Sequence, residues 1–349
     1  MKKHFEVLEG LRGVAAFVVL VFHYCEVVYY PDYETIPIGH GFLAVDFFFC
    51  LSGFIIAFAY SDRIKHIGIK QFMINRLIRL HPLVVFGIVL GLISYLINPY
   101  IKISGQIFQM IIAFFCSIFL IPYTKLQYRE GELFPYNTPL WSLLFEYIAN
   151  IIFAFVLCRL RKAFLLLVGA LCALWLVFCA QRSGWIINGW NVVHWSDGLA
   201  RVGFSFIAGM ILYQLNWIWK NKTGIWIMLL LGGVLAFPHF ENDWIVECVI
   251  VIVCFPLIVS LGAGTSVQEA GKKICLFLGK MSYPLYVTHF VTVSLFGSYF
   301  FQHESKPEGI YMLLTVMSLV LFNVLIAYLT LRFYDEPVRE KLKRIIKLL

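Results

Sequence analysis

Long apolar runs, each about the length of a membrane-spanning helix, follow one another along the whole chain. An α-helix needs about 20 apolar residues to cross the hydrocarbon core of a bilayer. Eleven runs approach this length: residues 11–30, 42–60, 80–97, 107–121, 140–157, 163–180, 199–215, 224–237, 244–261, 281–301 and 310–331. No long polar segment separates them. The pattern predicts an all-α, polytopic transmembrane helix bundle that forms one membrane domain over residues 1–349.

The run at residues 106–122 differs from the others, because it is short and lies between Pro99 and Pro122. If all the runs crossed the bilayer, the basic clusters at residues 63–79 and 159–162 would face opposite sides. Lys and Arg favour the cytoplasmic side of membrane helices. We therefore predict about ten spans, with this run re-entrant or interfacial and both termini cytoplasmic. Only six of the 28 Lys and Arg residues then lie outside: Lys102, Lys125, Arg129, Arg182, Arg201 and Lys306.

The composition indicates that lipid is the solvent of this chain. Hydrophobic residues make up 61% of the chain and charged residues 14%, whereas a soluble domain carries roughly 25% charged residues. The net charge of +8 follows from topology and does not indicate nucleic-acid binding. The nine cysteines form no Cys-x-x-Cys pair, so we expect small hydrophobic fillers. The basic tail, residues 332–349, is either a cytoplasmic amphipathic helix on the inner leaflet or a stop-transfer flank.

Ionisable residues inside the predicted spans are few, and they mark candidate sites because burying charge in a membrane is costly. Arg12 and His23 share a face of the first span, about 16 Å apart along the helix axis. Asp46 and Glu146 are predicted to lie at the depth of His23. Histidine exchanges a proton near neutral pH, and a carboxylate can orient its ring. We therefore predict that His23 acts as a base with Asp46 or Glu146 as its partner.

Three arginines gather at the predicted cytoplasmic ends of these helices. Arg76 and Arg79 are spaced i, i+3 and share a helix face, and Arg12 lies at a similar depth. Guanidinium groups bind phosphate through paired hydrogen bonds. The three residues therefore predict a site for a phosphate-rich ligand.

Each candidate also has a structural interpretation. The three arginines can be positive-inside residues at helix ends, and His23 can join packed helices through a hydrogen bond. Asp46 and Glu146 can pair with arginines. The set as a whole favours a functional site, because helix ends require neither carboxylates nor a histidine at matched depth.

Two further residues are weaker candidates. Arg201, near the outer end of its span, either holds an oxyanion or acceptor or pairs with Asp197 at the surface. His289, in the middle of its span, either lines the same cavity or packs in the core. The sequence leaves both alternatives open.

Five short segments carry a further signal. They are LEGLRGVAA (residues 8–16) with FHY (22–24), DFFFCLSGF (46–54), RLIRLHP (76–82), WSLLFE (141–146) and SYPLYVTH (282–289). In this order they resemble the acyltransferase-3 family of bacterial membrane O-acyltransferases. Two departures are mild, since Glu9 stands where Asp is more usual and His81 where Tyr is common. The chain resembles a stand-alone member without a C-terminal esterase-like domain.

The resemblance implies an O-acyltransferase of the bacterial cytoplasmic (inner) membrane. Its donor would be a cytoplasmic acyl-CoA, expected to be acetyl-CoA, and its acceptor a hydroxyl of a glycan or lipid-linked sugar. No metal is expected, because no clustered ligand spacing indicates one. The implied roles are donor binding by Arg12, Arg76 and Arg79, catalysis by His23 with Asp46 or Glu146, and substrate contacts by Arg201, Tyr286 and His289.

A proton- or ion-coupled transporter is the main alternative, because it would use the same buried charged residues. Transporters often show paired halves or helices broken at matching positions, and the sequence has neither. A structural or sensory membrane protein is a third possibility, and it would leave the inner arginines free to vary. Acyl-CoA-dependent labelling of a glycan separates the enzyme from both.

Overall fold

The computed structural model describes residues 5–303 and 306–348, and within them the chain is helical without a β-strand. The α-helices are α1 (Glu6–Val28), α2 (Ala44–Tyr60), α3 (Ile64–Ile97), α4 (Ile107–Ile118), α5 (Leu140–Phe155), α6 (Lys162–Ser183), α7 (Trp195–Gln214), α8 (Gly224–Leu235), α9 (Asp243–Val249), α10 (Phe255–Gly264), α11 (Glu269–Gln302), α12 (Gly309–Thr330) and α13 (Glu336–Leu348). Short helical turns lie at η1 (Tyr33–Thr35), η2 (Gly41–Leu43), η3 (Leu157–Arg159), η4 (Ile250–Cys254) and η5 (Leu331–Asp335). The predicted all-α bundle is confirmed.

Each predicted apolar run coincides with helical structure. Among the described residues, seven helical segments are long and apolar enough to cross a membrane: Glu6–Val28, Gly41–Tyr60, Ile64–Ile97, Leu140–Arg159, Lys162–Ser183, Asp243–Gly264 and Gly309–Ile346. The helices α4 and α8 have 12 residues each, which is about 18 Å of helix against a hydrocarbon core of about 30 Å. The count of ten spans therefore stays a prediction.

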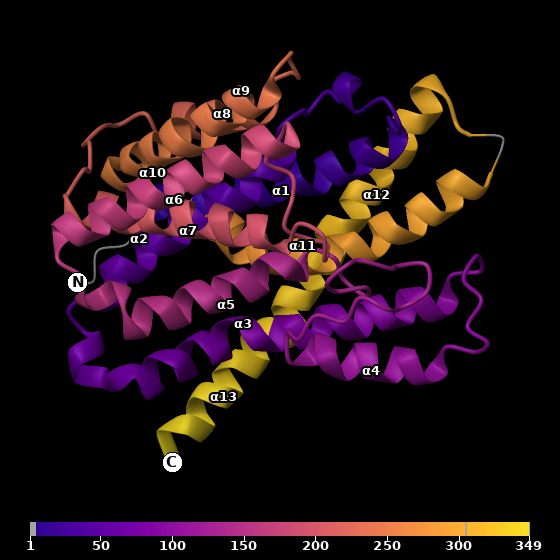
Figure 1. The fold of residues 1–349 in the computed structure, drawn as a ribbon, viewed down its shortest axis with the longest axis horizontal. Coiled ribbons are helices and arrows are strands. Elements are labelled where there is room, and N and C mark those ends of the chain that lie inside the picture. The colour runs from indigo at the N-terminus through magenta and orange to yellow at the C-terminus, as the bar shows by residue number, and fades with distance from the viewer. Residues whose placement is uncertain (1–4, 304–305, 349) are drawn as a thin grey trace.

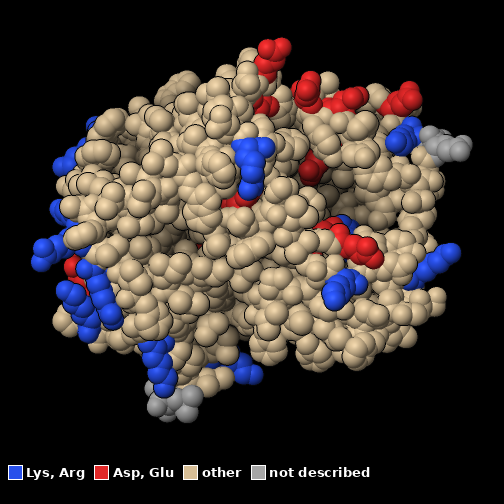
Figure 2. All heavy atoms as spheres, in the orientation of Figure 1, with Lys and Arg blue, Asp and Glu red and all other residues tan. Residues whose placement is uncertain are grey.

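The two ends of the bundle differ in charge. Figure 1 shows most helices running side by side along the long axis, with the tail helix α13 pointing toward one end of the bundle. In the same orientation, Figure 2 shows Lys and Arg gathered mainly at that end, while Asp and Glu gather mainly elsewhere. This is the pattern expected if that end is cytoplasmic. Lys2 and Lys3, which belong to the predicted cytoplasmic charge, lie outside the described residues.

The helices α2 and α7 pack closely because each has a glycine at the crossing. A Cβ atom on Gly53 would lie 1.9 Å from the carbonyl oxygen of Phe206, and one on Gly209 would lie 1.9 Å from the carbonyl oxygen of Cys50. Small residues allow such close approach in membrane bundles. The contact brings the buried faces of α2 and α7 together.

A second close contact joins α1 to α11. A Cβ atom on Gly13 would lie 2.5 Å from the Cβ of Leu278. Further along the same pair of helices, the Tyr24 hydroxyl donates a hydrogen bond to Thr292 Oγ1 over 2.9 Å. The two helices that carry the predicted Arg12, His23 and His289 are therefore held side by side.

The C-terminal tail forms α13, which continues from α12 through η5. Its start is fixed against α3, because the Tyr334 hydroxyl donates a hydrogen bond to the carbonyl oxygen of Pro82 over 3.1 Å. Arg339 forms an ion pair with Asp335 at 2.6 Å. The tail is thus helical from Glu336 to Leu348. Its position on the inner leaflet stays a prediction. Leu349, which the predicted tail also includes, lies outside the described residues.

Candidate active site

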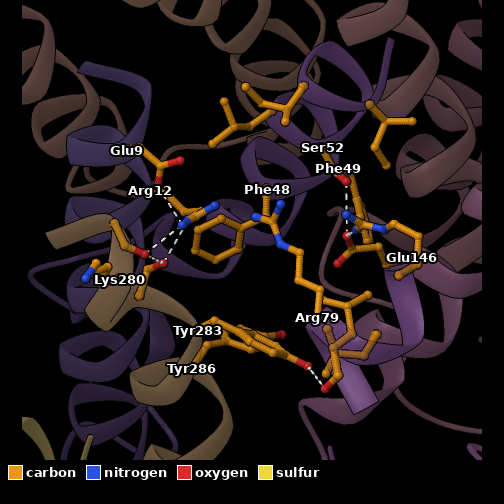
Figure 3. Close-up of a pocket in the computed structure, with 18 of the residues that line it drawn as sticks. Glu9, Arg12, Phe48, Phe49, Ser52, Arg79, Glu146, Lys280, Tyr283 and Tyr286 are labelled. Atoms are coloured by element: carbon orange, nitrogen blue, oxygen red, sulfur yellow. Dashed lines mark hydrogen bonds and ion pairs between the residues drawn. The ribbon is translucent and has the colours of Figure 1, made fainter. Parts of the chain in front are cut away.

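A cavity of about 740 Å³ lies between α1, α2, α3, α5, α11 and α13. Six basic side chains line it: Arg12, Arg76, Arg79, Lys280, Arg339 and Lys343. Figure 3 shows the guanidinium groups of Arg12 and Arg79 directed toward one another across this space. The three arginines that the sequence singled out therefore belong to one cavity.

Arg12 is fixed in place by α11 and by its own helix. Its Nε donates a hydrogen bond to Ser282 Oγ over 2.9 Å, and its guanidinium donates another to the carbonyl oxygen of Gly279 over 2.7 Å. It also forms an ion pair with Glu9 at 2.6 Å. Most of the donor capacity of Arg12 is thus used inside the protein, while its positive charge remains at the cavity wall.

Arg76 and Arg79 differ in their partners although they are one helical turn apart. Arg76 forms an ion pair with Glu146 at 2.6 Å, and Ser52 donates a hydrogen bond to the same carboxylate oxygen over 3.0 Å. For Arg79, no hydrogen bond or ion pair with any described residue is present, and its side chain reaches into the cavity (Figure 3). Arg79 is therefore the guanidinium available to a ligand.

His23 has a carboxylate partner, but it is neither of the two predicted from depth. Its Nδ1 lies 2.9 Å from Glu26 Oε2, one turn along α1. Asp46 and Glu146 each pair with an arginine instead. The prediction of Asp46 or Glu146 as the orienting group was wrong, because helical rise gives the depth of a residue but not the direction in which its side chain points.

The ring of His23 stacks on the ring of His289, with centroids 5.3 Å apart and planes inclined by 20°. His289 Nδ1 lies 2.8 Å from the carbonyl oxygen of Tyr286. A carbonyl oxygen only accepts, so Nδ1 carries the proton and Nε2 holds a lone pair. Buried Nε2 has no hydrogen-bond partner among the described residues. His289 thus packs directly against His23.

Tyr286 connects this pair of histidines to the cavity. Its ring centroid lies 5.8 Å from that of His289, and its side chain lines the cavity. Its hydroxyl lies 2.8 Å from Ser142 Oγ, so the ring is held in place. Ring contacts therefore lead from the cavity through Tyr286 and His289 to His23.

Asp46 and Arg201 form a buried ion pair. The shortest contact is 2.6 Å, and the side chains are 0% and 2% exposed. Arg201 also donates a hydrogen bond to the carbonyl oxygen of Asn188 over 2.9 Å and lies 5.0 Å from the ring centroid of Trp141. The alternative pairing of Arg201 with Asp197 was wrong, because Asp197 pairs with Arg182 at 2.7 Å. The pair holds α2 against α7 and does not face the cavity.

Sequence reasoning missed several residues of the site. Glu26 lies at i+3 from His23, a spacing that places both on one helix face. Lys280 and Arg339 lie in segments that the sequence marked only as basic flanks, and so does Lys343. The spacing of Glu26 was a usable signal, whereas nothing in the pattern of the tail indicates that it lines a cavity.

The fold and the cavity together define a polytopic helical membrane protein with a cation-lined internal site. The family model described as an acyltransferase domain matches residues 5–332, and the chain belongs to this acyltransferase-3 family. The predicted family resemblance is confirmed.

Two relatives from Staphylococcus aureus are each named O-acetyltransferase OatA, one from strain NCTC 8325 / PS 47 and one from strain COL. Each is 25% identical over 374 residues, which cover 96% of this chain. This chain spans 57% of the length of these relatives. No solved structure matches.

Proposed function

We propose that this protein transfers an acyl group, with acetyl expected, from a cytoplasmic acyl-CoA to a hydroxyl of a glycan or lipid-linked sugar. The observation that carries the proposal is Arg79, a guanidinium without a hydrogen-bond or ion-pair partner among the described residues, inside a cavity lined by five further basic residues and three carboxylates. A structural cluster would pair its charges. A site that leaves cations free of such pairing is suited to an anionic ligand.

The cavity suits the phosphates of coenzyme A. Its volume of about 740 Å³ lies within the range of ligand pockets, about 300–1,000 Å³. Arg79 and Lys343 supply positive charge that no ion pair with a described residue neutralises, and guanidinium groups bind phosphate through paired hydrogen bonds. The pantetheine arm would then extend past Tyr286 toward His23. The basic end of the bundle is the cytoplasmic end in this proposal, where acyl-CoA is available.

In the proposed reaction His23 is the general base. Its Nδ1–H donates to Glu26, which leaves the lone pair of Nε2 free. Nε2 takes the proton of the sugar hydroxyl as its oxygen attacks the thioester carbonyl, and the carbon–oxygen bond forms. The tetrahedral intermediate collapses, the carbon–sulfur bond breaks, and the imidazolium returns the proton to the CoA thiolate. Glu26 stabilises the imidazolium between these steps.

The acceptor would approach from the other end of the bundle. The side chains of His23 and Glu26 are 20% and 32% exposed, although neither lines the donor cavity. Figure 2 shows a hollow in the surface, on a part of the molecule that lies apart from the end rich in Lys and Arg.

The bacterial relatives named O-acetyltransferase support acetyl as the acyl group and the bacterial cytoplasmic membrane as the location. Tyr286 and His289 are proposed to position the reacting groups.

The test begins with binding, which needs no acceptor. The protein purified in detergent is titrated with acetyl-CoA by calorimetry, and we expect saturable binding that CoA competes for. Labelled acetyl transfer is then measured in proteoliposomes supplied with a bacterial glycan fraction. His23→Gln should abolish transfer and keep binding, whereas the exposed control His66→Gln should keep both. Absence of acetyl-CoA binding by folded protein would reject the proposal and favour a transporter.

A further inference from the structure

A cluster of metal-ligand side chains lies away from the cavity, where the connection between α1 and α2 meets the connection between α8 and α9. It consists of His40, His239 and Asp243, whose potential ligand atoms all lie within 4.8 Å of one another. About 200 positions separate His40 from the other two residues along the chain, so no sequence spacing could indicate the cluster.

His40 is in the form that binds a metal. Its side chain is completely buried, and its Nδ1 donates a hydrogen bond to the carbonyl oxygen of Phe237 over 2.8 Å. The proton therefore lies on Nδ1, and Nε2 presents a lone pair. Nε2 is buried, has no hydrogen-bond partner among the described residues, and lies 3.9 Å from Asp243 Oδ1. Metal-bound histidines commonly hold their other ring nitrogen on a backbone carbonyl in this way.

His239, in the other connection, and Asp243, the first residue of α9, complete the cluster. His239 Nδ1 contacts Asp243 Oδ2, and Asp243 Oδ1 accepts a hydrogen bond from the backbone N–H of Phe240 over 2.6 Å. The side chains of His239 and Asp243 are 9% and 14% exposed. An ion from solvent can therefore reach the buried His40, and water can occupy a remaining ligand position.

The backbone holds the two connections close enough for shared ligation. The N–H of His40 donates a hydrogen bond to the carbonyl oxygen of Leu235 over 3.1 Å. A Cβ atom on Gly39 would lie 2.7 Å from the carbonyl oxygen of Phe237 and 3.1 Å from the His239 ring. Glycine is therefore required at position 39 for this approach, which supports a built site.

We propose that His40, His239 and Asp243 bind one Zn²⁺ ion, which joins these two connections of the bundle. Two imidazoles and one carboxylate are ligands that Zn²⁺ takes, with bonds of about 2.0–2.2 Å. Tetrahedral ligand atoms then lie about 3.3 Å apart, so small side-chain rotations close the observed separations. Oxygen-preferring Mg²⁺ and Ca²⁺ fit this ligand set poorly.

The ion would act as a structural clamp and not in acyl transfer. None of its ligands lines the donor cavity, and the expectation that the transfer itself needs no metal is a separate prediction. The cluster does, however, lie close to the buried ion pair of Asp46 and Arg201, which joins α2 to α7. Phe42, two residues after His40, accepts a hydrogen bond from Arg201 through its carbonyl oxygen over 3.4 Å. Binding should therefore stabilise the end of the bundle that carries this pair.

The test uses the full chain without a polyhistidine tag, stripped of metal with EDTA and titrated with Zn²⁺ against a chromogenic chelator. We expect one Zn²⁺ per chain and a rise of the Tm on binding. His40→Ala, His239→Ala and Asp243→Asn should each weaken binding by about 10²-fold or more, and His194→Ala, outside the cluster, should leave it unchanged. Asp243→Asn keeps the size of the side chain, so its loss of binding does not depend on misfolding.

A second measurement reports on the ligands directly. Co²⁺ bound in place of Zn²⁺ should give the visible absorption of a tetrahedral site in the wild-type chain and lose it in His40→Ala. Wild-type protein that binds no Zn²⁺ would overturn the proposal, as would tight binding that survives in His40→Ala. Both results are independent of acyl transfer, so they leave the proposed enzymatic function untouched.

Discussion

His23 and Glu26 lie one helical turn apart on α1 with Nδ1 and Oε2 2.9 Å from each other. This pair has the arrangement of a base and its orienting carboxylate, and it comes from a single helix. Because Asp46 and Glu146 are each held by an arginine, Glu26 is the carboxylate that can stabilise a charged His23. We therefore predict that the reaction depends on Glu26, and not on Asp46 or Glu146, as the carboxylate partner of His23.

Glu26→Gln should lower kcat for acetyl transfer by about 10²-fold or more, because the amide cannot stabilise the imidazolium. The KM for acetyl-CoA should change little, since Glu26 lies outside the donor cavity. Initial rates in proteoliposomes measure both. Glu34→Gln, at an exposed acidic residue of the connection that follows α1, is the matched control and should be silent. An unchanged kcat in Glu26→Gln would contradict the role of the pair.

The neighbouring arginines of α3 should respond differently to the same substitution. Arg79→Ala removes a free cation, so we expect acetyl-CoA affinity to fall about tenfold or more with an unchanged Tm. Arg76→Ala leaves Glu146 without its cation, so we expect a lower Tm. Calorimetry and thermal unfolding measure the two effects. The control is Arg63→Ala, at a residue that is exposed and outside the cavity, and it should change neither the acetyl-CoA affinity nor the Tm. An Arg79→Ala chain that binds acetyl-CoA normally would exclude the proposed phosphate site.

The helices could be predicted from sequence because lipid leaves the backbone no partner except itself, so each apolar run must be helical. The depths of Arg12, Arg76 and Arg79 were also predictable from helical rise, and one cavity contains all three. The direction in which each side chain points around its helix could not be predicted in this way, and so Glu26 was missed as the partner of His23. Contacts between distant segments were equally hidden, as the cavity-lining Arg339 of the tail shows.

The ion pair of Asp46 and Arg201 should matter for stability and not for chemistry. Removing one partner leaves a buried charge unpaired, which costs about 3–5 kcal/mol. We therefore expect Asp46→Asn and Arg201→Gln each to lower the Tm clearly, and Asp46→Leu/Arg201→Met to regain much of that loss. Thermal unfolding in detergent measures the effect. Folded Arg201→Gln protein with normal Tm and no activity would instead support a direct role in the reaction.

Gly209 should tolerate no side chain, because its Cβ would lie 1.9 Å from the backbone carbonyl oxygen of Cys50. Backbone cannot rotate away as a side chain can, so Gly209→Ala must separate α2 from α7. Overpacking of this kind costs about 1–3 kcal/mol, and the change should weaken the nearby ion pair of Asp46 and Arg201 as well. Gly232→Ala on α8 is the matched control, since no heavy atom lies within 4 Å of its Cβ position. We expect thermal unfolding to give a lower Tm for Gly209→Ala and an unchanged or higher Tm for Gly232→Ala. Equal Tm values for the two variants would mean that α2 and α7 do not cross at Gly209 as closely as described.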